Sequence, residues 1–273
     1  MQIEKPLTIG AAASSFAKPA RAVDADLLRR VRTGRVLIAG LGGLGSPAAL
    51  WLARAGVGAL GLLDSDAVES SNLNRQVVYR TADIGRRKAA VAAERVRAVN
   101  PAVDVEILDQ RLVPSGVVPL FQRFDFVIDG TDSIVSKYLV NDGAVLAGVA
   151  FSHAGVVGFQ GQTMTVLPRR SACLRCLFPT PPREGEIPNC QEAGIIGALA
   201  GSVGLVQAAE AVKHLMGVGG LLADRLLTYD AAAARWRTVT LSRDRRCPLC
   251  GDRRTIETVQ LVDAAECANP VAR

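Results

Sequence analysis

Short, continuous runs of apolar residues alternate along the first half of the chain with longer segments in which apolar residues recur at helical spacing. The clearest predicted strand covers residues 36–39; it leads into a group of glycines and then into a predicted helix over residues 46–55. The elements predicted after it are strands over 59–63, 103–108 and 124–128 and helices over 86–99 and 117–122. Strands that alternate with helices predict a parallel sheet with helices on both faces.

The pattern changes in the second half of the chain. After a helix predicted over residues 133–146, two apolar runs at 151–157 and 161–167 flank a Gly-Phe-Gln turn and predict a hairpin. Five prolines between residues 168 and 188 predict an irregular segment that extends through residue 192. The last predicted elements are a helix over 202–216 and a hairpin of 226–230 and 235–241. The predicted fold class is α/β: a Rossmann-like, doubly wound, mainly parallel sheet with an antiparallel C-terminal extension.

Composition narrows the class of protein. With 49% hydrophobic and 21% charged residues, the chain has the composition of a folded globular protein. The longest uncharged apolar stretch, residues 193–206, contains four glycines and is shorter than the roughly 20 residues that cross a bilayer. No secretory apolar region is visible near the N-terminus, so we expect a cytoplasmic protein without membrane contact.

The net charge of +6 favours phosphate-bearing or acidic partners. Nucleic acid is a poor candidate, because aromatic residues make up only 4% of the chain and basic residues form no long run.

A glycine-rich turn joins the first predicted strand to its helix. Gly40, Gly42 and Gly45 form the pattern G-x-G-x-x-G, in which backbone N–H groups and a helix N-terminus can receive phosphate. Asp64 ends the next predicted strand, 24 residues after Gly40, where an acid accepts hydrogen bonds from ribose hydroxyls. The combination predicts a bound nucleotide.

The residues that follow favour a triphosphate over a dinucleotide. Arg75 lies in a polar loop, Lys88 lies in a predicted helix, and Asp132 follows the strand predicted at 124–128. Two cations and a carboxylate at the carboxyl ends of parallel strands suit ATP and Mg²⁺ better than NAD. Two other functions stay open: an NAD(P)-dependent oxidoreductase on the same fold, and a protein that binds a partner without catalysis.

Several motifs together resemble the ThiF/MoeB/HesA family, the bacterial relatives of ubiquitin-activating enzymes. They are Gly-Leu-Gly-Gly-Leu-Gly at 40–45, the segment from Asp64 to Gln76, Lys88, Gly130-Thr131-Asp132 and Gly161-Gln162. The resemblance extends from about residue 35 to residue 251. It implies ATP-dependent adenylation of the C-terminal glycine of a ubiquitin-like sulfur carrier protein of the ThiS/MoaD type ending in Gly-Gly, with release of pyrophosphate. It also implies a homodimer that serves sulfur transfer in thiamine or molybdopterin biosynthesis.

The resemblance assigns roles to individual residues. The implied nucleotide-binding set is Gly40, Gly42, Gly43, Gly45, Asp64, Asp66, Ser71, Asn72, Leu73, Asn74, Arg75, Lys88, Asp132 and Ser133. Within it, Arg75 and Lys88 would hold phosphates and Asp132 would hold Mg²⁺; these three and Cys190 form the implied catalytic set.

Two positions depart from the family pattern. Ser133 stands where the family usually has asparagine after the magnesium-binding aspartate. Before the first strand, the family carries an arginine motif that reaches the partner subunit's ATP site. The arginines in that region here, which do not form the motif, are Arg21, Arg29, Arg30 and Arg32.

Four of the six cysteines form two C-x-x-C pairs, Cys173/Cys176 and Cys247/Cys250. Four thiolates match a closed, tetrahedral, structural Zn²⁺ site, which we favour over two disulfides or a redox pair because we expect an intracellular protein. For Cys190 the resemblance implies a sulfur relay, and an inert cysteine is the alternative. We expect any persulfide to come from a separate donor protein. Cys267 is expected to be incidental.

We expect three regions in the chain: an N-terminal arm with a short basic helix (1–34), an adenylyltransferase domain (35–251) and a C-terminal tail (252–273). Within the domain, the zinc-bound loop and a crossover segment are expected at about 168–200. His153 and His214 have neither metal-ligand spacing nor a Ser/His/Asp arrangement, so both are expected to pack rather than to catalyse.

Overall fold

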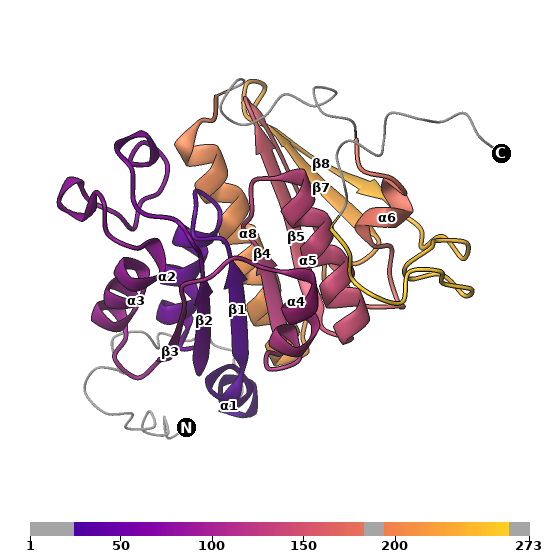
Figure 1. Ribbon diagram of the computed structural model, residues 1–273, viewed down its shortest axis with the longest axis horizontal. Coiled ribbons are helices and arrows are strands. Elements are labelled where there is room, and N and C mark those ends of the chain that lie inside the picture. The colour runs from indigo at the N-terminus through magenta and orange to yellow at the C-terminus, as the bar shows by residue number, and fades with distance from the viewer. Residues whose placement is uncertain (1–24, 183–193, 262–273) are drawn as a thin grey trace, which may run out of the picture.

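One eight-stranded sheet, in the order β3-β2-β1-β4-β5-β6-β7-β8, runs through the part of the chain that the computed structural model describes, residues 25–182 and 194–261 (Figure 1). The strands are β1 (Arg35–Ala39), β2 (Ala59–Leu63), β3 (Asp104–Leu108), β4 (Phe126–Asp129), β5 (Ala150–Val157), β6 (Gln160–Val166), β7 (Arg225–Asp230) and β8 (Arg235–Thr240). Strands β1 to β5 pair in parallel, and β6, β7 and β8 continue the sheet antiparallel. The predicted fold class is confirmed.

Helices cover both faces of the parallel part. They are α1 (Ala25–Thr33), α2 (Gly45–Ala55), α3 (Lys88–Val99), α4 (Pro114–Phe121), α5 (Ile134–Ala147), α6 (Leu174–Leu177) and α8 (Gly197–Met216), with short 3₁₀ turns at η1 (Ser70–Asn72) and η2 (Thr81–Asp83). Side chains alternate along each strand, so Val36 and Ile38 pack in one core with α2, α3 and α8. Leu37 and Ala39 pack in a second core with α4 and α5. Continuous apolar strands are what burial on both faces requires.

Helix α8 begins at Gly197, whereas the sequence predicts its start at Ser202 and assigns residues up to about 200 to a crossover segment. Two glycines of this helix are packing positions. A Cβ at Gly197 would lie 2.3 Å from the carbonyl oxygen of Asn74, and one at Gly204 would lie 2.2 Å from that of Leu44. Backbone contact replaces side-chain contact along this helix, which sequence periodicity does not reveal. The short helix α6 likewise lies inside the segment predicted to be irregular.

We expect Gly204→Ala to lower the free energy of unfolding by about 1–3 kcal/mol, because the added methyl group meets backbone that cannot rotate away. Gly201 is the matched control, since a Cβ there meets nothing within 4 Å. Gly201→Ala should stabilise the helix, by up to about 1 kcal/mol. Urea denaturation of the two variants measures both effects, and equal stability of the two would contradict this account of the α8 contact.

Candidate active site and metal centre

Two loops meet where β1 and β4 end. The first, the glycine loop (residues 40–45), joins β1 to α2; the second, the aspartate turn (residues 129–131), begins the connection from β4 to α5. A Cβ at Gly40 would lie 2.7 Å from the carbonyl carbon of Gly130, and one at Gly130 would lie 2.5 Å from the carbonyl oxygen of Gly40. Gly40 also has a left-handed backbone, with φ of 93°. The strand order reverses between β1 and β4, which is where doubly wound folds bind ligands.

The second and third glycines of the motif have different surroundings. A Cβ at Gly45 would lie 1.9 Å from the carbonyl oxygen of Gly40, so this position closes the turn. At Gly42 the nearest atom would be Nε2 of Gln76, 3.8 Å away, which leaves room for a ligand to approach the backbone. Gly43 lies between Ala200 of α8 and Arg75, whose Cγ would be 3.5 Å from an added Cβ. The N-terminus of α2 is therefore accessible at Gly42 and bordered by a cation.

Asp64 is held against the glycine loop by backbone donors. Its Oδ2 accepts a hydrogen bond of 2.8 Å from the N–H of Leu41, and its Oδ1 accepts one of 2.9 Å from the N–H of Asp66. Burial raises the pKa of Asp64, opposed mainly by the charge of Lys88. The structure therefore places the acid predicted to bind ribose beside the glycine loop.

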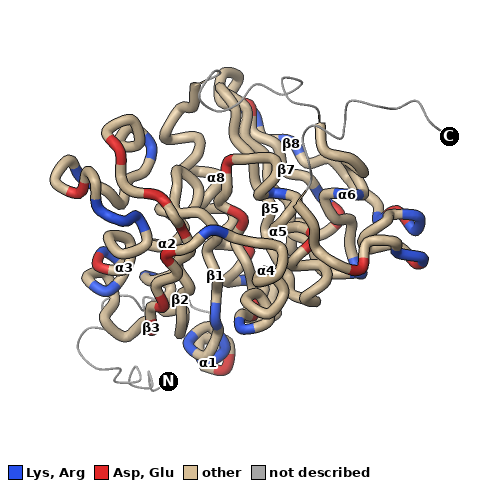
Figure 2. Tube along the Cα trace, in the orientation of Figure 1, with Lys and Arg blue, Asp and Glu red and all other residues tan. Residues whose placement is uncertain are grey.

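Lys88, the first residue of α3, is only 6% exposed although it carries a charge. Its Nζ lies 3.0 Å from Oδ2 of the exposed Asp66. Charged residues of both signs follow one another through the segment between β2 and α3 (Figure 2). A buried ammonium paired with an exposed carboxylate can exchange that carboxylate for a phosphate at small cost in desolvation.

The loop that contains η1 presents some of its predicted residues and buries others. Arg75 donates from Nη1 to the carbonyl oxygen of Ser71 at 2.9 Å and to Oδ1 of Asn74 at 3.1 Å. Asn72 is buried and its Oδ1 accepts from the N–H of Glu69 at 3.3 Å, while Leu73 packs in a small apolar cluster. Ser71, Asn74 and Arg75 are thus the members of this loop that are available to a ligand.

Asp132 and Ser133 separate into two roles. Asp132 is exposed and directly follows the aspartate turn that contacts the glycine loop. Ser133 caps α5, because its side chain accepts a hydrogen bond of 3.1 Å from the N–H of Ser136. The serine that departs from the family pattern therefore stabilises a helix N-terminus.

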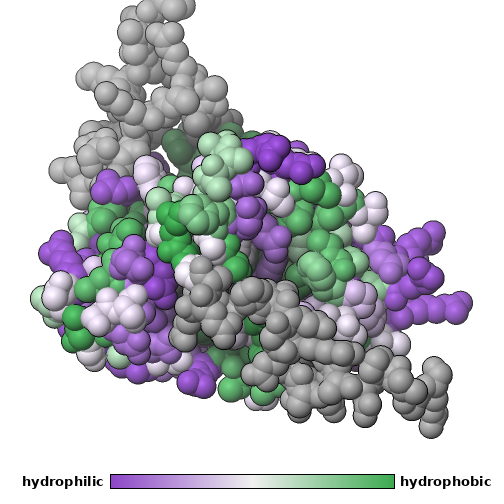
Figure 3. All heavy atoms as spheres, turned by 90° about the horizontal axis from the view of Figure 1, so that it is seen from above, coloured by the Kyte–Doolittle hydropathy of each residue, from purple (hydrophilic) through white to green (hydrophobic). Residues whose placement is uncertain are grey.

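The sequence did not identify two buried features of this region. The hydroxyl of Tyr79 donates to the carbonyl oxygen of Leu41 at 3.0 Å, and burial raises the pKa of Tyr79, so it stays protonated as a donor. Under the aspartate turn, Asp129 contacts both His153 and Lys137. The position of Asp129 at the end of an apolar strand was the one sequence signal that pointed to this buried carboxylate. Figure 3 looks onto this end of the molecule and shows hydrophilic residues between hydrophobic areas.

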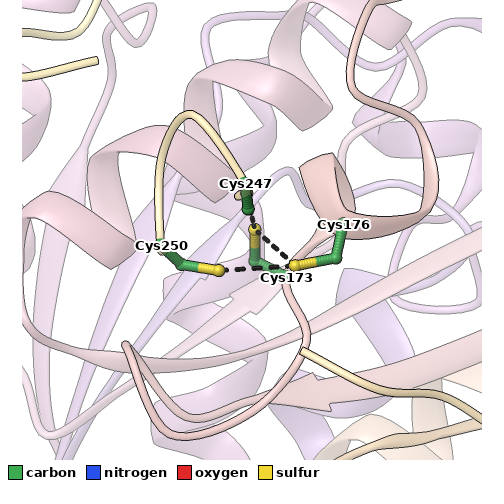
Figure 4. A group of neighbouring side chains, drawn as sticks. All are labelled: Cys173, Cys176, Cys247 and Cys250. Atoms are coloured by element: carbon green, nitrogen blue, oxygen red, sulfur yellow. Dashed lines mark hydrogen bonds between the residues drawn. The ribbon is translucent and has the colours of Figure 1, made fainter. Parts of the chain in front are cut away.

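The four cysteines of the two C-x-x-C pairs come together, with all four Sγ atoms within 4.8 Å of one another (Figure 4). Sulfur separations of 3.9 Å (Cys173–Cys176), 3.7 Å (Cys173–Cys247) and 3.4 Å (Cys176–Cys250) exclude disulfide bonds. A tetrahedron with Zn–S bonds of about 2.3 Å has sulfur separations of about 3.8 Å. The cluster therefore fits Zn²⁺ and could hold it.

Backbone groups support the cysteine cluster. The N–H of Asp244 lies 3.4 Å from Sγ of Cys176, and Arg243 donates to the carbonyl oxygen of Cys250. The hydrogen bond with Cys173 lowers the pKa of Cys176 to about 7 and raises that of Cys173. Thiolate is the form that binds metal. A full set of four protein ligands leaves no position for water, which makes the site structural.

Some predicted residues remain unplaced or have other partners. Cys190, Cys267 and Arg21 lie outside the described residues. Arg29 and Arg30 both pair with Asp26 on α1. His153 is packed, as expected, and the ring of His214 lies tilted against that of Phe126, with ring centroids 5.2 Å apart. Within the described ranges, no helix has the length and apolar character needed to cross a membrane.

Comparison with known proteins agrees with this fold. The profile of the ThiF family matches residues 16–249. The chain is 44% identical over 231 residues to the sulfur carrier protein adenylyltransferase of Thermus thermophilus, covering 83% of this chain and 85% of that protein. It is 41% identical to the SAMP-activating enzyme E1 of Haloferax volcanii, covering 87% of each.

Other similar proteins are longer or more distant. The probable adenylyltransferase/sulfurtransferase MoeZ of Mycobacterium tuberculosis is 42% identical, and this chain spans 58% of its length. A crystal structure of E. coli MccB with ATP superposes with a TM-score of 0.74 at 19% identity, over 83% of this chain and 68% of that one. At this identity the likeness concerns the fold.

We expect one equivalent of zinc per chain and a loss of both zinc and stability in Cys250→Ser. The lost ligand should lower Tm by about 5–10 °C, equivalent to about 2–4 kcal/mol for a domain of this size. Zinc analysis and calorimetry measure the two effects. Cys267→Ser, which removes a cysteine expected to be incidental, is the control. Full zinc content in Cys250→Ser would show that the cluster is not the binding site.

Proposed function

The chain belongs to the ThiF family, and on that basis we propose that it is an ATP-dependent adenylyltransferase that activates the C-terminal glycine of a ubiquitin-like sulfur carrier protein. The observation that supports this most is the meeting of the glycine loop with the aspartate turn at the strand-order reversal, with Arg75 and Lys88 on the same edge of the sheet. Sulfur transfer in thiamine or molybdopterin biosynthesis is the proposed setting.

In the proposed reaction, a carboxylate oxygen of the carrier attacks the α-phosphorus of ATP. A new P–O bond forms, the bond to the β-phosphate oxygen breaks, and pyrophosphate leaves with the electron pair. The carboxylate is already ionised near neutral pH, so the enzyme needs no strong general base. Positioning the two reactants and neutralising the phosphates provide the acceleration.

The residues fit this division of labour. Backbone N–H groups at Gly42 and the N-terminus of α2 would receive phosphate, and Asp64 would accept from ribose hydroxyls. Arg75, beside Gly43, and Lys88 would neutralise phosphate oxygens. The exposed carboxylate of Asp132 offers oxygen ligands, the type that Mg²⁺ prefers, and bound Mg²⁺ would supply further charge neutralisation.

We further propose a homodimer and a separate persulfide donor. Trp51 of α2 and Leu205 of α8 are 55% and 38% exposed on helices that pack against each other. Contiguous exposed apolar surface is typical of a face that a partner covers, and we propose these two helices as the place where the second subunit binds. Sedimentation equilibrium distinguishes the dimer from a monomer directly.

Asp132→Ala should reduce carrier-dependent exchange of pyrophosphate into ATP by at least about 100-fold. The reason is that Mg²⁺, whose charge stabilises the transition state, loses a protein ligand. Thermal unfolding should stay close to wild type, since Asp132 is exposed. Asp104→Ala is the control, because Asp104 is an exposed aspartate at the amino end of β3. Wild-type exchange in folded Asp132→Ala would contradict its role, and NAD binding without any exchange would contradict the proposed function.

Cys190→Ala should leave pyrophosphate exchange within about twofold of wild type, because adenylation does not use a thiol. It should reduce sulfur transfer to the carrier by at least about 10-fold if the thiol relays sulfur. Both rates are measured on the same preparation, with the carrier and a persulfide donor supplied. Unchanged sulfur transfer would establish Cys190 as inert.

A further inference from the structure

A buried charge cluster lies under the aspartate turn. Asp129 at the end of β4 is fully buried, His153 of β5 is 4% exposed, and the side chain of Lys137 of α5 is 14% exposed. Three elements thus contribute one ionisable side chain each to a single point at the carboxyl edge of the sheet. Such a cluster is costly to bury and stabilises no more than packed apolar residues would.

The Asp129 carboxylate makes four polar contacts with protein groups. Oδ1 accepts from the N–H of Thr131 at 3.1 Å and from its hydroxyl at 2.6 Å. Oδ2 lies 2.9 Å from Nδ1 of His153 and 3.4 Å from Nζ of Lys137. Lys137, followed by His153 and Thr131, overcomes the effect of burial and lowers the pKa of Asp129, so the carboxylate is ionised.

Lys137 completes the enclosure of Thr131. Its ammonium donates to the carbonyl oxygen of Thr131 at 2.7 Å and to that of Ala154 at 2.6 Å. The N–H, hydroxyl and carbonyl of Thr131 are therefore all fixed by the cluster. Thr131 immediately precedes Asp132, so the cluster fixes the backbone from which the Asp132 carboxylate extends.

Burial lowers the pKa of His153 despite the opposing effect of Asp129. The ring is therefore neutral near neutral pH, and its Nδ1–H is the donor to Asp129. One cation and one anion then balance inside the cluster, and the histidine contributes a hydrogen bond without a second positive charge.

We propose that Asp129, Lys137 and His153 are positioning residues for adenylation, which hold the aspartate turn so that Asp132 presents its carboxylate to Mg²⁺ and the phosphates. The inference rests on the proposed function. A positioning role differs from a purely structural one in what a substitution changes. Replacing one of these side chains should alter the Mg²⁺ requirement of the reaction as well as the stability of the protein, although none of them touches the substrate.

The test is the Mg²⁺ concentration that gives half-maximal carrier-dependent pyrophosphate exchange at saturating ATP. Lys137→Met should raise it by about 10–100-fold, the effect typical of removing a group that orients a metal ligand. Lys213→Met is the matched control: Lys213 pairs with the buried Glu210 and donates to the carbonyl oxygen of Gly220 at 3.0 Å, outside the cluster. That variant should lose stability while its Mg²⁺ requirement stays within about twofold.

A second pair of variants decides the matter where Lys137→Met does not fold. His153→Leu removes the donor to Asp129 and should raise the Mg²⁺ requirement, whereas His153→Asn carries an amide near the position of Nδ1 and should restore it. A folded Lys137→Met enzyme with wild-type Mg²⁺ dependence would overturn the proposal, as would an equal shift in Lys213→Met or in the two His153 variants.

Absence of exchange in the wild-type protein is a different result, because it contradicts the proposed function. Calorimetric titration of the same variants with ATP at several Mg²⁺ concentrations then tests the positioning role by itself. Weaker magnesium-dependent ATP binding in Lys137→Met than in Lys213→Met would support it, and equal binding would overturn it.

Discussion

Contact between two stretches of backbone determines where the candidate active site is located. The glycine loop and the aspartate turn approach so closely that a side chain at Gly40, Gly45 or Gly130 would collide with main-chain atoms. Only glycine allows the ends of β1 and β4 to meet in this way. The functional groups that border the site lie on segments arranged around this contact: Asp64 bonds to the glycine loop, Arg75 lies beside it, and Asp132 follows the turn.

Helix α5 connects this edge with the cysteine cluster. Its first turn follows Asp132, and Lys137 one turn later reaches back under the aspartate turn. Farther along, Asp142 receives two hydrogen bonds from the buried guanidinium of Arg175, and Oδ1 of Asn141 accepts from the N–H of Leu174. Both partners lie between Cys173 and Cys176. One rigid helix therefore fixes the distance between the candidate active site and the metal centre.

The sequence predicted much of this arrangement, for identifiable reasons. Fully buried parallel strands leave continuous apolar runs, and the motif around Gly40 to Gly45 has a local geometric cause, so both can be read without tertiary information. The two C-x-x-C pairs likewise predict four thiols that can bind one metal ion. What failed depends on contacts between distant segments. The sequence places the start of α8 at Ser202 instead of Gly197, because it does not show the backbone contact between Gly197 and Asn74. Asp129, Lys137 and His153 come from three different elements, and no spacing or motif in the sequence indicates that they meet.

The cysteine cluster also bears on the order in which the molecule is made. Residues 173 and 247 are separated by 74 positions, and the chain between them contains α8, β7 and β8. A metal cross-link that closes a loop of this length lowers the conformational entropy of the unfolded chain, which stabilises the folded state by about 4 kcal/mol. The helix that contacts Asn74 and Leu44 leaves the ribosome before Cys247 and Cys250 do. The candidate nucleotide-binding edge can therefore assemble on the nascent chain first, and a metal held by the four cysteines would secure it once Cys247 and Cys250 emerge.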